Sequence, residues 1–346
     1  MPRLGLLGPP NSGKSTLFNA LTGLDAATAA HPFTTIEPQP GVAEVKDDKL
    51  LQVGRLEGSA KVVPATIELV DLPSWRPGGG SQVLATLREM DGLVAVLGSF
   101  ERGTDPAEQA EELSLELVFA DHEVFEKRNQ RLQKEATAEP RLRSAAEAVA
   151  RAVGELDAGK ALRLVDWSAE ELKALRDSAP LTLKPFIWVV NHAEDAADVE
   201  RLTAVVAACV VAGDVVVGMA ARLEEEARHL DEASRVEAYL ALGLGSGALV
   251  RMVEAAYRAL GLISFYTVGP KEARAWTVVA GANAAQAAGR IHSDLERGFI
   301  RAEVAHIDAV LAAGGWEAAK KRGTVRLEGR NYVVGKGDVL HVRFSV

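Results

Sequence analysis

The sequence has little cysteine and no large excess of charge of either sign. Its 346 residues include a single cysteine, Cys209, which excludes an intrachain disulfide and a metal site built from several cysteines. So few thiols are typical of a reducing compartment. Acidic residues outnumber basic residues 48 to 39, which argues against a protein that coats nucleic acid over its whole surface. With 48% hydrophobic and 25% charged residues, the composition is neither disordered nor fibrous.

Long apolar segments are also scarce. The N-terminus lacks a signal-peptide pattern, because the apolar stretch 4–7 runs directly into a glycine-rich loop. Residues 202–221 have the length of a membrane span, but Gly213 and Asp214 form a turn signal within them. A charge inside the segment disfavours a membrane span. We therefore expect a cytoplasmic protein without a membrane partner.

Short apolar runs recur along the first 260 residues and alternate with helical segments. The runs are rich in β-branched residues and end in polar or glycine-containing turns, which is typical of buried parallel strands. They comprise residues 4–7, 67–70, 93–97, 187–190 and 215–217. The alternation predicts an α/β fold, a doubly wound P-loop NTPase sheet that binds ligands at the carboxyl ends of its strands.

The pattern changes twice, and these changes set the predicted domains. Residues 106–181 carry helical stripes with coiled-coil spacing, which predicts an inserted antiparallel helical hairpin joined near Glu139 and Pro140. Residues 263–346 are β-rich and hold 12 basic against 8 acidic residues. That excess fits a contact for RNA or a ribonucleoprotein, and an ordinary solvated surface equally well. Residues 1–105 and 182–262 then form the nucleotide-binding domain.

The strongest chemical signal is a phosphate-binding loop at residues 8–15, placed between a predicted strand and a predicted helix. Backbone N–H groups of such a loop surround a phosphate at the positive end of the helix. Lys14 has the length to reach the β- and γ-phosphate oxygens, and the Ser15 hydroxyl is a ligand for Mg²⁺. The predicted nucleotide-contacting residues are Asn11, Ser12, Gly13, Lys14, Ser15 and Thr16.

Two further positions complete a predicted Mg²⁺ site with Ser15. Asp71 ends the apolar run 67–70, where a carboxylate holds Mg²⁺ in P-loop NTPases, here through water. Thr35 has the spacing of the switch threonine that closes over Mg²⁺ and the γ-phosphate. Thr34 is the competing choice in the same loop. Lys14 and Thr35 are the candidate catalytic residues.

The base-reading residues are predicted after the run 187–190. GTPases place Asn-Lys-x-Asp here, and the aspartate binds the guanine edge. In this sequence Asn191 is kept, His192 replaces the lysine and Glu194 replaces the aspartate. The longer Glu194 cannot take the aspartate's position without moving the base. Guanine preference should therefore weaken, and adenine becomes plausible; the sequence leaves ATP and GTP open.

Together these motifs resemble the YchF subfamily of Obg-related translation-factor GTPases, the Obg-like ATPases. The resemblance covers nearly the whole chain. It is carried by Pro-Asn-x-Gly-Lys-Ser-Thr at 10–16, Pro-Phe-x-Thr-Ile-Glu-Pro at 32–38, Leu-Thr-Leu-Lys-Pro at 181–185, Asn-x-x-Glu at 191–194, and the stretches 271–277, 286–294, 298–304, 327–332 and 337–339.

The resemblance implies several properties. It implies ATP binding with slow hydrolysis and association with the ribosome, its large subunit or ribosomal RNA. It implies that 263–346 is a TGS domain, a β-grasp module, and that Ala220 and Ala221 form the last base-contacting loop. The oligomeric state stays open, with a monomer favoured.

The chain departs from the family at the hydrolytic machinery. The family has Asp-x-x-Gly after the Mg²⁺ strand, whereas Ser74 stands at that glycine's position and Trp75 follows it. No histidine occurs between His31 and His122, and His122 fits an ordinary helical surface histidine, so the family's catalytic histidine has no counterpart. Gln82 and Gln109 are substitutes without a motif. Two hypotheses follow: a slow NTPase, or a non-hydrolysing adaptor in which nucleotide fixes conformation and the TGS domain binds ribosome or RNA.

Overall fold

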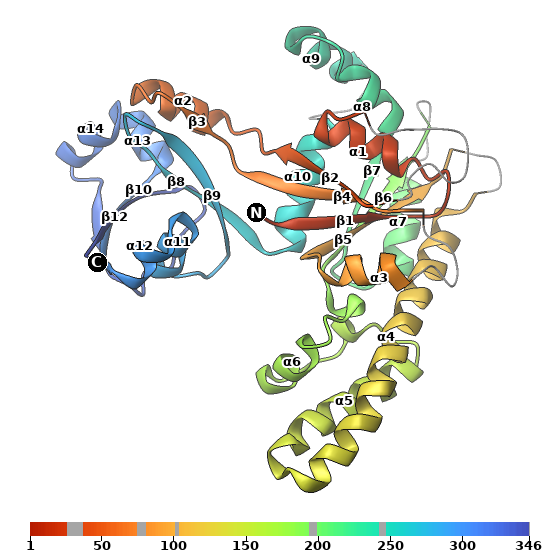
Figure 1. The fold of residues 1–346 in the computed structure, drawn as a ribbon. Helices are drawn as coiled ribbons and strands as arrows, with labels where there is room; N and C mark the ends of the chain where they lie inside the picture. The colour runs from red at the N-terminus through yellow and green to blue at the C-terminus, as the bar shows by residue number, and fades with distance from the viewer. Residues whose placement is uncertain (26–36, 75–80, 101–103, 194–198, 242–246, 346) are drawn as a thin grey trace. The chain divides into compact units, whose positions relative to one another are not determined.

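The computed structural model describes residues 1–25, 37–74, 81–100, 104–193, 199–241 and 247–345. Its contacts divide the chain into two units (Figure 1). The larger unit comprises Arg3–Gly41 and Glu68–Ala255, and the smaller unit comprises Met1–Pro2, Val42–Ile67 and Ala256–Val346. No helix of the described residues is long and apolar enough to cross a membrane.

The described strands that lie wholly or partly in the larger unit form a six-stranded sheet in the order β2-β4-β1-β5-β6-β7. Neighbours from β4 to β7 pair in parallel, as the apolar runs predict. Every residue of the two central strands β5 and β6 is buried, which explains their uninterrupted apolar sequences. The strands are β1 (Arg3–Leu7), β2 (Gln39–Glu44), β4 (Thr66–Asp71), β5 (Gly92–Gly98), β6 (Phe186–Asn191) and β7 (Val215–Met219).

Helices cover both faces of this sheet, so the predicted doubly wound α/β fold is confirmed. Apolar side chains of α3 (Ser81–Arg88), α4 (Pro106–Ala138) and α7 (Val199–Cys209) share one core with β5 and β6. Figure 1 shows α1 (Lys14–Thr22) and α8 (Ala221–Ala227) on the opposite side. The unit also contains α9 (Glu232–Ala241), and α10 (Ala248–Ala259) begins in it.

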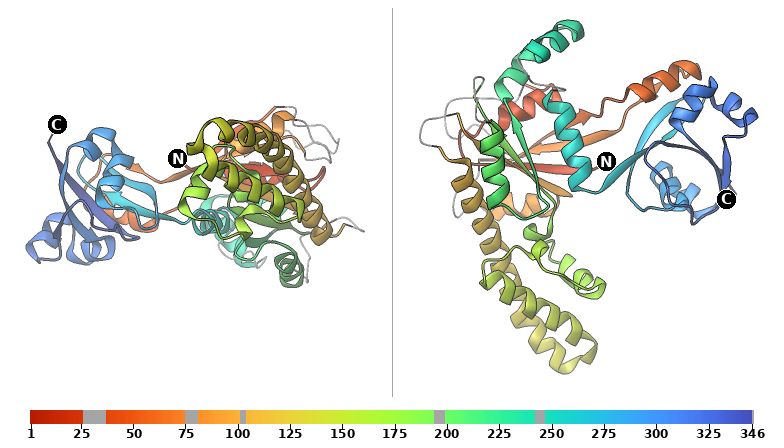
Figure 2. Two further views of the ribbon diagram at one scale, coloured as in Figure 1. Left: turned by 90° about the horizontal axis from the view of Figure 1, so that it is seen from below. Right: turned by 180° about the vertical axis from the view of Figure 1, so that it is seen from behind.

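The predicted helical hairpin is present. Helix α4 ends at Ala138, a 3-10 turn follows at Pro140–Leu142, and α5 (Arg143–Asp157) packs back along α4 (Figure 2). Helix α6 (Ala169–Arg176) begins with the expected capping box, in which Ser168 and Glu171 satisfy each other's backbone N–H groups. Apolar residues of the three helices form one core around Phe125 and Val149.

A buried carboxylate fastens this hairpin to the sheet. Asp121 of α4 is fully buried and accepts hydrogen bonds from the Arg88 guanidinium at 2.8 Å and from the Leu181 and Thr182 N–H groups at 3.0 and 2.7 Å. The Thr182 hydroxyl donates a further bond at 2.8 Å. Because a buried charge is tolerated only when its bonding capacity is filled, Asp121 fixes α4 against α3 and the approach to β6.

The described strands of the smaller unit form another six-stranded sheet, in the order β11-β10-β12-β8-β9-β3. One face carries a core with α2, α13 and α14, and the other carries a core with α11. Its elements are α2 (Asp48–Leu56), β3 (Val62–Val63), β8 (Leu262–Thr267), β9 (Ala273–Val279), α11 (Ala284–Ile291), α12 (Ser293–Arg297), β10 (Phe299–His306), α13 (Ile307–Ala313), α14 (Trp316–Lys321), β11 (Arg326–Glu328) and β12 (Asp338–Phe344).

Residues 42–67 belong to a different unit from the one that the sequence predicts. That division puts them in the nucleotide-binding domain, whereas the structure groups them with the C-terminal residues. The reason is apolar packing, because Leu50 and Val53 of α2 lie in the same core as Trp316 of α14. Asp47, which caps α2, also accepts a hydrogen bond from the Tyr266 hydroxyl at 2.5 Å.

Candidate functional site

The predicted phosphate loop connects the end of β1 to the start of α1 at the carboxyl edge of the sheet. Its backbone needs glycine at two points. A Cβ on Gly8 would lie 2.3 Å from the Val96 carbonyl oxygen, and Gly13 has a φ of 82° at the N-cap of α1. Asn11 also has a positive φ, of 61°. Among the described residues no side chain caps α1, and the first N–H groups of a helix can bind an anion.

Asn191 holds this loop against two other segments. Its Nδ2 donates to the Ser12 carbonyl oxygen at 2.9 Å, and its Oδ1 accepts from the Ala221 N–H at 3.0 Å. A Cβ on Gly13 would lie only 2.0 Å from Nδ2, so the closeness of loop and amide itself requires glycine. The structure thus brings together Ser12, Gly13, Asn191 and Ala221, which the sequence analysis assigns to nucleotide binding from separate motifs.

Lys14, Ser15 and Asp71 meet beside the loop. The Lys14 ammonium donates to Asp71 Oδ1, and the Ser15 hydroxyl donates to Asp71 Oδ2 at 2.8 Å. Lys14 and Asp71 are 4% and 0% exposed. Burial lowers the pKa of Lys14 below its usual value, and the attraction of Asp71 opposes this only in part. The cluster supplies hard oxygen ligands, a hydroxyl and a carboxylate, of the kind Mg²⁺ prefers.

A polar atom without a partner marks the inner wall of the loop. Ser12 is 2% exposed, and its hydroxyl has no hydrogen-bond partner among the described residues. A buried hydroxyl left unpaired is costly, which makes it a natural contact for a bound polar group. The residues present therefore fit a bound polyphosphate.

A cleft of about 870 Å³ lies next to the loop, large enough for a nucleoside. Phe100, to which the sequence motifs give no role, lines this cleft and is 40% exposed although it is large and apolar. An aromatic residue three positions after the apolar run 93–97 was the available signal. The lining residues are Gly13, Thr16, Phe100, Asn191, His192, Ala193, Ala220, Arg222, Glu225 and Glu226.

Several predicted residues are not tested by this geometry. Thr34, Thr35, Trp75 and Glu194 lie outside the described residues. Ala220 caps α8 and lines the cleft, next to the Ala221 N–H that Asn191 binds. The base- and metal-contacting roles of all these residues stay predictions.

Two of the candidate water-positioning side chains, Gln109 and His122, are bonded to other groups. Gln109 of α4 clamps the backbone of Gly98 at the end of β5, accepting from its N–H and donating to its carbonyl oxygen at 3.0 Å each. His122 lies within the helical hairpin, where its Nε2 is 2.8 Å from Asp157. This matches the expectation of an ordinary helical histidine.

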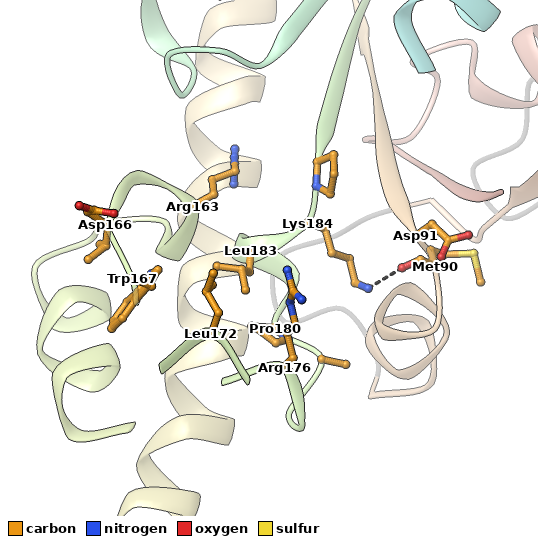
Figure 3. Close-up of a pocket in the computed structure, with 13 residues that line it drawn as sticks. Met90, Asp91, Arg163, Asp166, Trp167, Leu172, Arg176, Pro180, Leu183 and Lys184 are labelled. Carbon is orange, nitrogen blue, oxygen red and sulfur yellow. Dashed lines mark hydrogen bonds between the residues drawn. The ribbon is translucent and has the colours of Figure 1, made fainter. Parts of the chain in front are cut away.

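Another pocket, of about 730 Å³, lies at the opposite edge of the sheet, by the amino ends of β5 and β6 (Figure 3). The contacts of Lys184 in this pocket explain why the 181–185 motif contains a lysine. The Lys184 ammonium donates to the carbonyl oxygens of Arg88, the last residue of α3, and of Met90 just after it, at 2.9 and 2.5 Å. Burial lowers the pKa of Lys184. In this arrangement the lysine caps a helix, and the motif is structural.

The chain is similar to known proteins over 99% of its length. Residues 3–134 match a family model described as 50S ribosome-binding GTPase, and residues 262–345 match the YchF-GTPase C-terminal model, described as a protein of unknown function. The ribosome-binding ATPase YchF of Escherichia coli O157:H7 is 37% identical over 99% of both chains, and that of Bacillus subtilis is 36% identical. Obg-like ATPase 1 of Gallus gallus is 30% identical, covering 99% of this chain and 92% of its own.

A solved structure agrees with these relatives. The YchF GTPase of Schizosaccharomyces pombe superposes with a TM-score of 0.85 at 26% identity, over 99% of this chain and 97% of that one.

Proposed function

Since this chain belongs to the YchF family, we propose that it is a nucleotide-binding, ribosome-associated factor that binds ATP with Mg²⁺ and hydrolyses it slowly in the cytoplasm. The bacterial relatives are named ribosome-binding ATPases. The single observation that carries the proposal is the joint built by Asn191, which ties the glycine-bearing loop to α8 beside the cleft. In this proposal the loop is the phosphate cradle and the cleft receives the base, and the Asn191 joint supports the proposal because it ties the loop to α8 next to the cleft.

We assign the polyphosphate to the loop and to Lys14. In the structure, the Lys14 ammonium is bonded to Asp71. A bound polyphosphate offers Lys14 another anion, which would release the Asp71 carboxylate. Ser15 and Asp71 would then hold Mg²⁺, with Thr35 as the third proposed ligand; the ion would neutralise charge on the phosphates. The Ser12 hydroxyl gains a partner in the same event.

Hydrolysis is proposed to be slow because no water-positioning group is identified among the described residues around the loop. Positioning and charge stabilisation by Lys14 alone support some turnover. Loss of one such group lowers the rate by two to three orders of magnitude, or about 3–4 kcal/mol.

A second candidate function has its own support. Because Gln109 is tied to Gly98 and His122 to Asp157, the adaptor hypothesis, in which nucleotide fixes conformation without turnover, fits the same site. Single-turnover hydrolysis by the wild type and by Lys14→Ala separates the two. A faster wild type supports the NTPase, and identical rates leave the adaptor.

The proposed function as a whole is tested by calorimetry on the full chain stripped of nucleotide. Heat of binding on adding ATP with Mg²⁺, lost in Lys14→Ala, is expected. Absence of heat with ATP and with GTP refutes nucleotide binding.

The proposed ribosome contact lies in the 263–346 region, which we assign to a TGS domain. Because α2 packs its apolar side chains on this region, deletion of 263–346 would expose Leu50 and Val53 and confuse the result. The full chain with Lys321→Glu and Lys336→Glu is a cleaner test, since both residues are exposed. We expect weaker co-sedimentation with ribosomes and unchanged ATP binding. Unchanged pelleting would refute this contact.

A further inference from the structure

Strand β5 extends beyond its neighbour β1 at the edge of the sheet that carries the phosphate loop. The register of these two strands ends at the pair Leu7 and Ala95, whereas β5 continues to Gly98. On its other side, β5 stays paired with β6 as far as Gly98 and Asn191. The last residues of β5 therefore have one strand as a neighbour and lack the other.

The backbone of Gly98 faces the side on which β1 has ended. In a strand, the N–H and carbonyl groups of successive residues point alternately to the two neighbours. The N–H of Ser99, the next residue, donates to the Asn191 carbonyl oxygen at 2.9 Å, so the polar groups of Gly98 point away from β6. Gly98 is buried, and a buried backbone group without a partner is costly.

Gln109 of α4 takes the place of the missing strand. Its side-chain amide accepts from the Gly98 N–H and donates to the Gly98 carbonyl oxygen, at 3.0 Å each. A neighbouring strand would offer the same kinds of donor and acceptor from its backbone. The Gln109 amide therefore completes the hydrogen-bond ladder of β5 at its end.

The phosphate loop lies directly against this end of β5. A Cβ on Gly8 would lie 2.3 Å from the Val96 carbonyl oxygen. A Cβ on Gly98 would lie 3.3 Å from the Ser12 Cα and 3.4 Å from the Phe100 ring. Because backbone packs on backbone at these points, a shift of the strand end displaces the loop as well.

We propose that Gln109 is a positioning residue of the nucleotide site: it fixes the end of β5, and through it the phosphate loop and Phe100, and thereby raises nucleotide affinity. The inference rests on the proposed nucleotide function and adds a residue outside the nucleotide-binding motifs. Gln109 is not among the residues that line the cleft, so it acts through the backbone of Gly98. A site that is already held in its binding geometry binds more tightly, because less ordering is needed on binding.

The test measures dissociation constants for ADP with Mg²⁺ by calorimetry, and free energies of unfolding in urea, on the full chain stripped of nucleotide. Gln109→Met keeps the length of the side chain and removes both hydrogen bonds to Gly98. We expect this variant to bind ADP at least about fivefold more weakly, which is the fold-change of one neutral hydrogen bond. An affinity equal to that of the wild type would overturn the proposal.

A second anchor of α4 provides the matched control. Asp121 holds the same helix three turns further along, against Arg88 and the approach to β6. Asp121→Asn should lower the free energy of unfolding while its affinity for ADP stays within about twofold of the wild type. If Asp121→Asn and Gln109→Met lose the same affinity, the effect belongs to loosening of α4 in general and the positioning role is refuted.

Gln109→Glu adds a readout that a merely structural role would not move. Its carboxylate accepts from the Gly98 N–H but has no proton for the Gly98 carbonyl oxygen, whereas its protonated form supplies both contacts. Burial next to a carbonyl oxygen raises the pKa of a carboxyl at this position. The variant should bind ADP more weakly than the wild type at pH 8.0, and the ratio of the two dissociation constants should fall at least twofold at pH 5.5. A ratio that does not change with pH would contradict the proposal.

The other titratable groups around Gln109 are common to all these variants. Strand β5 carries none. Those on the first turns of α4, on α7, on the phosphate loop and after β6 are Asp105, Glu108, Glu111, Glu200, Arg201, Cys209, Lys14 and His192. Because the wild type carries every one of them, the ratio of dissociation constants reports the introduced carboxyl alone.

Failure of this proposal differs from failure of the proposed function. If the wild type binds ADP and Gln109→Met binds it equally well, the role of Gln109 is refuted while nucleotide binding stands. If the wild type does not bind ADP, the proposed function itself fails.

Discussion

Alanine at Gly13 should damage the nucleotide site far more than alanine at Gly23, although both glycines bound the same helix. Gly13 and Gly23 flank α1 with φ angles of 82° and 72°. A left-handed backbone costs an L-residue about 1–2 kcal/mol, and this cost is common to both substitutions. Around Gly23 nothing lies within 4 Å of a new Cβ, whereas at Gly13 the Cβ would lie 2.0 Å from Asn191 Nδ2.

The difference between the two variants can be worked out from that contact. The Asn191 amide must move away, which breaks its bonds to the Ser12 carbonyl and to the Ala221 N–H. Two hydrogen bonds contribute about 1–3 kcal/mol together, and the buried groups left behind add to the loss. We therefore expect Gly13→Ala to cost about 2–4 kcal/mol more than Gly23→Ala. If this cost falls on the binding-competent loop, ADP affinity drops about thirtyfold for every 2 kcal/mol.

The assay measures urea unfolding and ADP binding for the wild type and both variants. Gly23→Ala should lose about 1–2 kcal/mol of unfolding free energy with nearly unchanged affinity for ADP, because only the backbone term applies. Gly13→Ala should lose both stability and affinity. Equal affinities of the two variants for ADP would show that the Asn191 joint does not shape the site.

Three other perturbations follow from buried groups. Asp71→Asn leaves the Lys14 ammonium buried without its carboxylate, so unfolding free energy in urea should fall by about 3–5 kcal/mol, and less with saturating ADP; an equal loss with ADP would contradict the assignment of Lys14 to phosphate. His341 is stacked on Trp316 at 4.0 Å between ring centroids, and burial lowers its pKa in the folded protein. The unfolded chain therefore takes up the proton first, and stability is lost as pH falls below about 6.5. His341→Phe should raise the melting temperature more at pH 5 than at pH 8; an equal change at both would exclude this titration. Asp121→Ala removes the acceptor of four buried or half-buried donors and should lower unfolding free energy by about 3–5 kcal/mol, with a smaller loss for Asp121→Asn, which keeps one acceptor; equal losses would rule out hydrogen bonding as the cause.

Most of the fold of the larger unit can be predicted from local sequence patterns. Strands β5 and β6 are readable because burial on both faces leaves only apolar residues in them, and the capping box of α6 depends on residues three positions apart. Residues 42–67 are different. The amphipathic pattern of α2 shows that one side is buried but not against what, and the Asp47–Tyr266 bond spans 219 positions. Pairings at that separation leave no periodic trace in one sequence.

The candidate site also has a part that the sequence predicts and a part that it does not. The loop and Asn191 are predictable because their chemistry dictates residue types at fixed spacing. The tie between Asn191 and the loop is not, because an amide serves equally as a base contact and as a backbone bridge. Gln109 is an example of this ambiguity. The sequence makes it a candidate for orienting water, whereas in the structure its side chain is hydrogen-bonded to the Gly98 backbone.

Helix α4 contacts several of these segments. At its first turns Gln109 holds the end of β5, two residues before Phe100 enters the cleft. Three turns further, Asp121 holds Arg88 at the end of α3. One helix therefore contacts both the cleft strand and the helix that follows residues 75–80, and it continues without a break to the tip of the hairpin. Because α4 is hydrogen-bonded to both segments, we expect a movement of β5 or α3 on nucleotide binding to be transmitted to the hairpin. The helical insert is thus mechanically part of the nucleotide-binding unit, whatever partner its tip contacts.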